Sequence, residues 1–121
     1  MIVELKKTFR FEAAHHLPNL PDGHKCRRLH GHSFYFDVVV RGPVDEHTGL
    51  LMDFADIVDA VEPIRREVDH YHLNEIEGLE NPSSEIIARW LWNRIVQVLP
   101  MLHAIRVRET CTSECTFRGE H

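Results

Sequence analysis

The feature that most constrains the fold is an alternation of apolar and polar residues near the start of the chain. Between Val3 and Ala13 most odd positions are apolar, whereas the even positions carry Glu4, Lys6 and other polar side chains. A period of two residues is typical of a strand with one buried and one solvated face. His15 is also an odd position and therefore lies on the same face as the apolar residues. We therefore predict a half-buried strand that carries a histidine at its end.

A second strand is predicted from His30 to Arg41, where Gly42 and Pro43 end it. Its even positions hold two histidines followed by phenylalanines and valines, residues that favour strands. The intervening loop, Pro18 to Arg28, is rich in proline, glycine, aspartate and basic residues. Long loops in compact domains tend to be functional. We expect a hairpin whose long connection carries functional residues.

Two helical patterns follow the second strand. Asp53 precedes apolar residues that recur at spacings of three and four as far as Val68, which indicates an amphipathic helix. Asn81, followed by Pro82, is the predicted N-cap of a second helix that Pro100 ends. Both helices are expected to bury one face.

Strand patterns return after the second helix. A third strand includes Ile105, and a turn at residues 112–114 leads to a short fourth strand ending near Arg118. The order strand, strand, helix, helix, strand, strand predicts one α+β domain over residues 1–121. This length suits one hydrophobic core.

Composition excludes several classes of protein. The net charge of -5 argues against a general nucleic-acid binder. No apolar run approaches the roughly 20 residues of a membrane span, and the first residues do not resemble a signal peptide. The chain has three cysteines, and this odd number favours reduced thiols over a disulfide framework. We expect a cytoplasmic protein without a membrane partner.

Histidines are the most informative residues. His30 and His32 lie two apart on a predicted strand, so both imidazoles point to the same face, which is the spacing of a chelate. If the two strands pair, His15 can supply a third nitrogen. Three histidines with an open fourth position form a catalytic zinc arrangement. The alternative is that these rings are solvated or hydrogen-bonded in a core.

Cys26 lies four residues before His30 and is flanked by Lys25, Arg27 and Arg28. Nearby cations stabilise a thiolate, which makes a cysteine a usable base or nucleophile. Two other interpretations remain open from the spacing. Cys26 can be a fourth ligand of a closed structural zinc site, or an inert loop thiol.

Two acidic residues are further candidates. Asp69 precedes His70 and can orient its ring, as in acid–base relays, although the adjacency alone favours a solvated helix end. Glu109 shares its strand face with Ile105 and Val107, and a carboxylate at the edge of apolar surface usually has a cation or a ligand as partner.

Five segments together resemble the 6-pyruvoyltetrahydropterin synthase family. They are F-E-A-A-H at 11–15, C-R-R-L-H-G-H at 26–32, V-D-H at 68–70, N-P-S-S-E at 81–85 and E-T-C-T at 109–112. The resemblance runs from about Phe9 to Glu120. Five motifs in the right order are much more specific than any one of them.

The resemblance assigns functional residues. It implies zinc ligands at His15, His30 and His32, a catalytic cysteine at Cys26, a proton relay at Asp69 and His70, and a pterin-anchoring carboxylate at Glu109. A pterin presents two parallel N–H donors that one carboxylate can accept, as it accepts an arginine fork. Lys25, Arg27 and Arg28 then become candidate contacts of a triphosphate.

The resemblance also implies a reaction. The bacterial branch of the family is a zinc-dependent lyase of queuosine biosynthesis, which converts 7,8-dihydroneopterin triphosphate to 6-carboxytetrahydropterin, acetaldehyde and triphosphate. That branch has three residues between the cysteine and H-G-H, as here, whereas pyruvoyl-forming enzymes commonly have five. The alternatives are the pyruvoyl product and a noncatalytic zinc-stabilised domain.

The implied architecture is the tunnelling fold, or T-fold. It is an antiparallel four-stranded sheet with two helices on one face, in the order ββααββ. Three subunits close a barrel and two trimers stack into a homohexamer, with active sites at subunit boundaries. Within the N-P-S-S-E motif, Ser83, Ser84 and Glu85 are expected near the pterin or, equally, in the cap of a helix.

Overall fold

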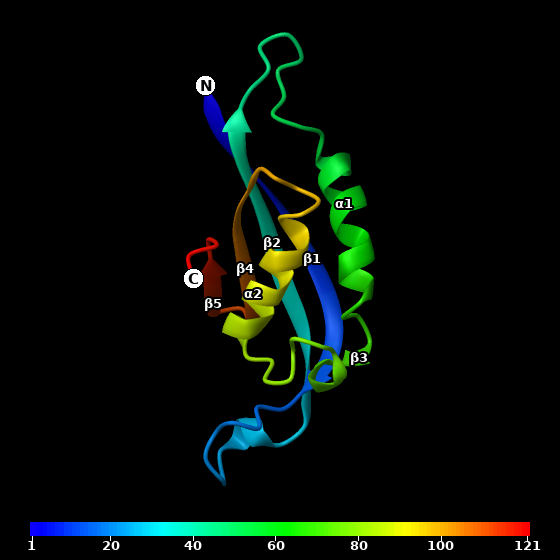
Figure 1. The fold of residues 1–121 in the computed structure, drawn as a ribbon, viewed down its shortest axis with the longest axis vertical. Helices are drawn as coiled ribbons and strands as arrows, with labels where there is room; N and C mark the ends of the chain where they lie inside the picture. Colours follow the sequence, from blue (N-terminus) through cyan, green and yellow to red (C-terminus); the bar gives the residue numbers. More distant parts are fainter.

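The computed structural model describes residues 1–121 as one sheet with two helices on one side (Figure 1). In chain order the elements are β1 (Ile2–His15), the 3-10 turn η1 (Lys25–Arg27), β2 (His30–Pro43), α1 (Phe54–Arg66), β3 (Tyr71–His72), the 3-10 turn η2 (Leu73–Glu75), α2 (Ser84–Ile95), β4 (Leu102–Thr110) and β5 (Ser113–Phe117). The predicted α+β class is confirmed. The predicted order is also confirmed, apart from the additional strand β3.

The two longest strands of the sheet, β1 and β2, form a hairpin. The two strands pair antiparallel over their full length, from Ile2 opposite Pro43 to His15 opposite His30, without a register shift. Residues opposite each other in such a pair point to the same face. The odd positions of β1 therefore share one face with the even positions of β2.

Aromatic side chains fill the face of the hairpin that the helices cover. Phe9 stacks on Phe36 and Phe11 stacks on Phe34, with ring centroids 5.2 Å and 4.9 Å apart. All four rings are buried. The same face continues toward the end of the hairpin that the 16–29 connection joins and reaches His15, which is only 1% exposed. A column of apolar rings thus ends in an imidazole.

The sheet has five strands in the order β3-β1-β2-β4-β5, one more than predicted. The additional strand is β3, whose two residues pair parallel with Ala13 and Ala14 of β1. The sheet is therefore mixed rather than purely antiparallel. A two-residue strand is too short to show a hydrophobic period, which is why the sequence pattern does not reveal it.

Helix α1 begins where the sequence predicts. The carboxylate of Asp53 accepts a hydrogen bond from the backbone N–H of Ala55 at 2.8 Å and caps the first turn. Ile57, Val61 and Ile64 are buried at spacings of four and three against the core. This periodicity lays the helix along the sheet and brings its last turn beside β1.

Helix α2 begins two residues later than predicted. The N-cap is Ser83, whose hydroxyl accepts from the N–H of Ile86 at 3.2 Å, whereas the carbonyl of Asn81 accepts from the N–H of Ser83. The prediction that Asn81 is the cap is wrong because Asn81 and Pro82 form a bend before the helix. The helix ends at Ile95, not at Pro100.

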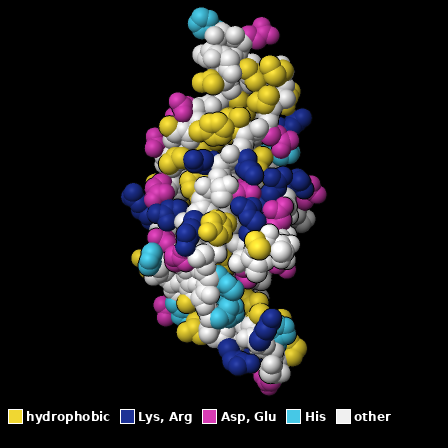
Figure 2. Space-filling view, turned by 180° about the vertical axis from the view of Figure 1, so that it is seen from behind, with side chains coloured by type: hydrophobic (Ala, Val, Ile, Leu, Met, Phe, Trp, Pro, Cys, Tyr) yellow, Lys and Arg dark blue, Asp and Glu magenta, His cyan; other side chains and the backbone are white.

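The opposite face of the sheet is polar. Figure 2 shows basic and acidic side chains intermixed over the middle of the molecule on the side away from the helices. Asp37 is buried there and accepts hydrogen bonds from Arg108 and Thr8. Burial alone raises the pKa of Asp37, but these two donors outweigh it and lower the pKa. Neither helix has the length and apolar composition needed to cross a membrane.

Candidate active site

Three histidines meet on the helix-covered face at the end of the hairpin next to the 16–29 connection. His15 and His30 are opposite partners in the hairpin, and His32 lies two residues further along β2 on the same face. One nitrogen from each ring lies within 4.8 Å of the other two. The ring centroids are 4.5 Å apart for His15 and His30, 4.8 Å for His30 and His32, and 5.2 Å for His15 and His32.

Backbone carbonyls orient two of these rings. His15 Nδ1 lies 2.8 Å from the carbonyl oxygen of Pro82, and His30 Nδ1 lies 2.7 Å from that of Arg28. A carbonyl oxygen only accepts, so each Nδ1 carries the proton and each Nε2 carries the free lone pair. The Nε2 of His15 is buried and has no hydrogen-bond partner.

This orphaned nitrogen fits a metal ligand. A buried acceptor without a partner costs about 1–3 kcal/mol, which a bound cation removes. Burial lowers the pKa of His15, and therefore the ring is neutral at neutral pH, the form that binds metal. Three neutral imidazoles are a zinc donor set that leaves a position for water or substrate. The three residues therefore fit zinc.

Glu109 lies beside this cluster on β4. Its Oε2 is 3.6 Å from His32 Nε2, and its Oε1 accepts a hydrogen bond from the hydroxyl of Ser84 at 3.0 Å. Ser84 is the first residue of α2 and directly follows Ser83, the helix cap. The two serines therefore make different contacts. Ser83 caps the helix, and Ser84 holds the carboxylate.

Cys26 is outside the histidine cluster. It lies in η1, where its N–H donates to His24 Nδ1 at 3.1 Å and its carbonyl accepts from the N–H of Leu17 at 2.7 Å. These contacts fix the backbone of the loop just beyond β1. Because the cluster of candidate ligand atoms does not include the thiol, the structure does not form the closed site with three histidines and one cysteine.

Arg27 is engaged within the loop. Its Nη1 donates to the carbonyl oxygens of Pro18 and Leu20, both at 2.8 Å, and its Nη2 lies 3.5 Å from Asp22. These bonds hold the hairpin connection in its observed shape. Lys25 begins the same turn, and Arg28 follows it. A triphosphate contact at any of the three basic residues stays a prediction.

Asp69 and His70 form a paired unit between α1 and β3. Asp69 Oδ2 lies 3.0 Å from His70 Nδ1, and Asp69 Oδ1 accepts from the N–H of Glu12 at 2.9 Å. The N–H of His70 returns a bond to the carbonyl of Glu12 at 2.6 Å. The N–H of Glu12, more than any other group, lowers the pKa of Asp69. Asp69 is therefore a fixed carboxylate rather than a solvated helix end.

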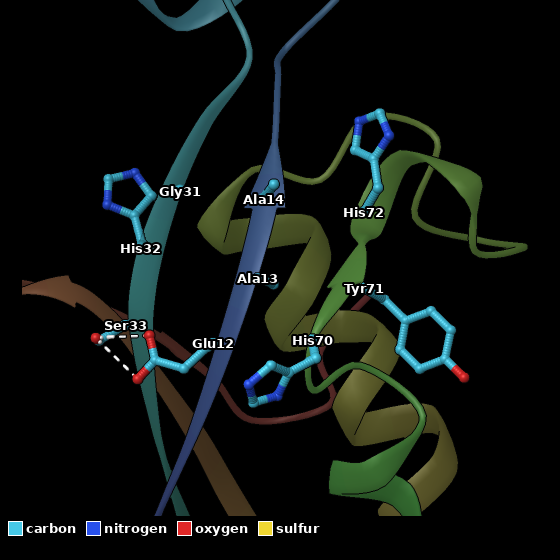
Figure 3. Close-up of a pocket in the computed structure, with 9 residues that line it drawn as sticks. All are labelled: Glu12, Ala13, Ala14, Gly31, His32, Ser33, His70, Tyr71 and His72. Atoms are coloured by element: carbon cyan, nitrogen blue, oxygen red, sulfur yellow. Dashed lines mark hydrogen bonds between the residues drawn. The ribbon is translucent and has the colours of Figure 1, made fainter.

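His70 and His32 line one open pocket of about 620 Å³ (Figure 3). Its remaining lining residues are Glu12, Ala13, Ala14, Gly31, Ser33, Tyr71 and His72. Small residues of β1 and β2 lie between the two histidines, which leaves the space above them open. His70 has φ 64° and a side chain that is 77% exposed. The left-handed backbone presents its ring to solvent.

His72 also lines this pocket but faces a different partner. Its Nε2 lies 3.4 Å from His16 Nδ1, and its Nδ1 lies 3.6 Å from Glu75. These contacts join His72 to the end of β1 and not to Asp69. Asp69 and His70 therefore pair without His72.

The sequence matches the model of one known family. The family is described as 6-pyruvoyl tetrahydropterin synthase, and the match covers residues 4–120. The chain belongs to this family. The observed architecture is the T-fold of its members. A 6-pyruvoyl tetrahydropterin synthase structure from Caenorhabditis elegans superimposes with a TM-score of 0.91 at 26% identity, covering 99% of this chain and 97% of that one.

Relatives within the synthase family carry names of different activities. A 6-carboxy-5,6,7,8-tetrahydropterin synthase from Synechocystis is 44% identical over 117 residues, which covers 92% of this chain and 89% of the relative. A dihydroneopterin monophosphate aldolase from Pyrococcus furiosus is 38% identical over 90 residues, which covers 74% of this chain and 72% of the relative. Members with different names thus share most of this chain.

Sequence reasoning missed the groups that orient the synthase-like site. The carbonyls of Pro82 and Arg28 fix two imidazoles, and no side-chain pattern reports the direction of a carbonyl. Arg65 contacts Asp69 at 3.3 Å. The four-residue spacing of that pair on the end of a helix was the available signal, because side chains at such spacing are neighbours.

Proposed function

We propose that this chain is a zinc-dependent 6-carboxy-5,6,7,8-tetrahydropterin synthase of queuosine biosynthesis. It converts 7,8-dihydroneopterin triphosphate to 6-carboxytetrahydropterin, acetaldehyde and triphosphate. The chain is a lyase by its family. The observation that carries the proposal is the orphaned Nε2 of His15 beside His30 and His32. The name of the Synechocystis relative supports the carboxy product.

The proposed zinc site consists of His15, His30 and His32. A zinc ion bound there supplies Lewis-acid polarisation of the hydroxyl groups on the substrate side chain. Pro82 and Arg28 hold two ligand rings by their carbonyls, so the site requires little reorganisation to accept the ion.

The remaining roles follow from chemistry at named atoms. Glu109 accepts the two parallel N–H donors of the pterin, and Ser84 holds that carboxylate in place. Cys26 and His70 move protons on the substrate side chain, and Asp69 fixes the His70 ring through Nδ1. The exposed Nε2 edge of His70 is then the edge available to substrate. Lys25, Arg27 and Arg28 are the proposed contacts of the triphosphate.

The product test uses zinc-loaded protein and 7,8-dihydroneopterin triphosphate. We expect acetaldehyde and triphosphate in equal amounts together with 6-carboxytetrahydropterin, and no turnover by protein from which zinc has been removed. A pyruvoyl product without acetaldehyde would contradict the carboxy assignment. Turnover of dihydroneopterin monophosphate in place of the triphosphate would support an aldolase, the activity named for the Pyrococcus relative.

The open edge of β1 supports a homohexameric assembly. β3 pairs with only two of the fourteen residues of β1, so most of this edge of the sheet lacks a strand partner. Closing the sheets of neighbouring subunits into a barrel covers such edges. We expect a solution mass six times the 14.2 kDa of the chain. A monomeric mass in light scattering would contradict the hexamer.

A further inference from the structure

Arg65 links three parts of the molecule at the end of α1. Its Nε and Nη2 donate to the two carboxylate oxygens of Glu62 at 2.9 Å and 2.8 Å. Its Nη1 donates to the carbonyl oxygen of Arg10 on β1 at 3.1 Å and lies 3.3 Å from Asp69 Oδ2. The side chain is 24% exposed. Bonds in three directions hold this guanidinium in one place.

One carboxylate oxygen of Asp69 contacts both His70 and Arg65. Oδ2 lies 3.0 Å from His70 Nδ1 and 3.3 Å from Arg65, while Oδ1 is occupied by the N–H of Glu12. A carboxylate with one oxygen bound to a backbone donor cannot rotate freely. Arg65 therefore fixes the remaining freedom of the oxygen that orients His70.

We propose that Arg65 is a positioning residue for the Asp69–His70 pair, holding Asp69 Oδ2 toward the ring and setting how strongly that oxygen accepts from it. This inference rests on the proposed role of the pair in proton transfer. Glu62 belongs to the same arrangement because its carboxylate accepts two of the hydrogen bonds that Arg65 donates. Weakening Glu62 leaves Arg65 free to bind Asp69 more tightly.

The charges around Asp69 agree with this arrangement. The N–H of Glu12 contributes most to lowering the pKa of Asp69, and the neighbouring His70 and Arg65 lower it further. The other charged groups packed nearby are Glu62 on α1 and Glu12 on β1, and Glu12 is itself bound by Arg10. His72 of β3 faces His16 instead.

The first test compares Arg65→Gln with Arg66→Gln. Arg66 also contacts Glu62, at 3.4 Å, but is 73% exposed and has no contact with Asp69, so it is the matched control. Removing the Arg65 cation should raise the pKa of Asp69 toward its ordinary value, measured by the ¹³C shift of its carboxyl group against pH. The acid limb of turnover should move to higher pH with it.

The same variant separates chemistry from binding. We expect Arg65→Gln to lower kcat roughly 10- to 100-fold with KM little changed, because a misplaced catalytic group affects the transition state. Arg66→Gln should leave kcat, KM and the Asp69 titration unchanged. Arg65→Lys keeps the charge and should restore the Asp69 titration in part.

A second variant gives the opposite sign. Glu62→Gln releases Arg65 toward Asp69 and should lower the pKa of Asp69 below that of the unmodified protein. A role in helix stability alone moves both variants in the same direction, or moves neither, and would overturn the proposal. The NMR titration needs no substrate. If the protein fails the product test but the Asp69 pKa shifts in both variants, the proposed function is wrong. The positioning of Asp69 by Arg65 is then still supported.

Discussion

The histidine cluster and the Asp69–His70 pair are positioned in opposite ways. The three histidines belong to one hairpin, and strand register alone brings His15 opposite His30. Asp69 and His70 lie between α1 and β3, and side-chain and backbone hydrogen bonds to Glu12 hold them. Regular structure therefore places the proposed metal site, whereas a few specific contacts place the proposed proton relay. We therefore expect the histidine cluster to tolerate substitutions of neighbouring residues. The Asp69–His70 pair should be sensitive to them.

Loss of a ligand is the most damaging change we expect. His30→Ala should lower zinc affinity by at least roughly 100-fold, since even the outer partners of ligand histidines contribute about 10- to 100-fold, and turnover should disappear. Metal content by mass spectrometry of the purified protein checks this. His16→Ala is the matched control because His16 neighbours His15 but lies outside the cluster. Equal zinc loss in both variants would argue against the assigned ligands.

Cys26 tests the boundary of the metal site. Cys26→Ala should reduce turnover roughly 10³-fold or more while zinc stays bound, because the thiol acts on substrate and lies outside the cluster. Metal content and product formation are measured on the same sample. Loss of zinc from this variant would instead make Cys26 a fourth ligand.

Asp69→Asn is expected to act on the relay only. The amide still accepts from the N–H of Glu12, but its other end presents donors to His70 Nδ1 and Arg65. Turnover should fall roughly 10²- to 10⁴-fold, the range of general acid–base contributions. Zinc content should not change. A variant that loses zinc as well would show that the two regions are less independent than the contacts indicate.

Ser84→Ala is expected to have the smallest effect. Losing one hydrogen bond to Glu109 costs about 1 kcal/mol, which corresponds to an increase in KM of about fivefold. Ser83→Ala is the control and should lower helix stability by about 1 kcal/mol while KM stays the same. Thermal unfolding and steady-state kinetics distinguish the two serines. A KM effect from Ser83 would contradict the division of roles.

The same contrast explains what the sequence could predict. The alternation from Val3 to His15 and the H-x-H spacing on β2 are local patterns, so the hairpin and the cluster at its end could be expected from the residues alone. The bond between Asp69 and Glu12 joins residues 57 apart, and no periodicity encodes it. The strand β3 and the true cap of α2 were missed because each depends on one or two residues. Family resemblance, not pattern, identified the pair as functional.

The uninterrupted pairing of β1 with β2 has a consequence for changes in chain length. A single inserted or deleted residue anywhere in either strand would exchange the two faces of everything beyond it, which would turn His15 or His30 and His32 away from their partners. The β2–β4 pairing already contains an irregularity near Val39, so that side can absorb an offset. Natural variation in length should therefore collect in the connection at residues 16–29 and spare the strands.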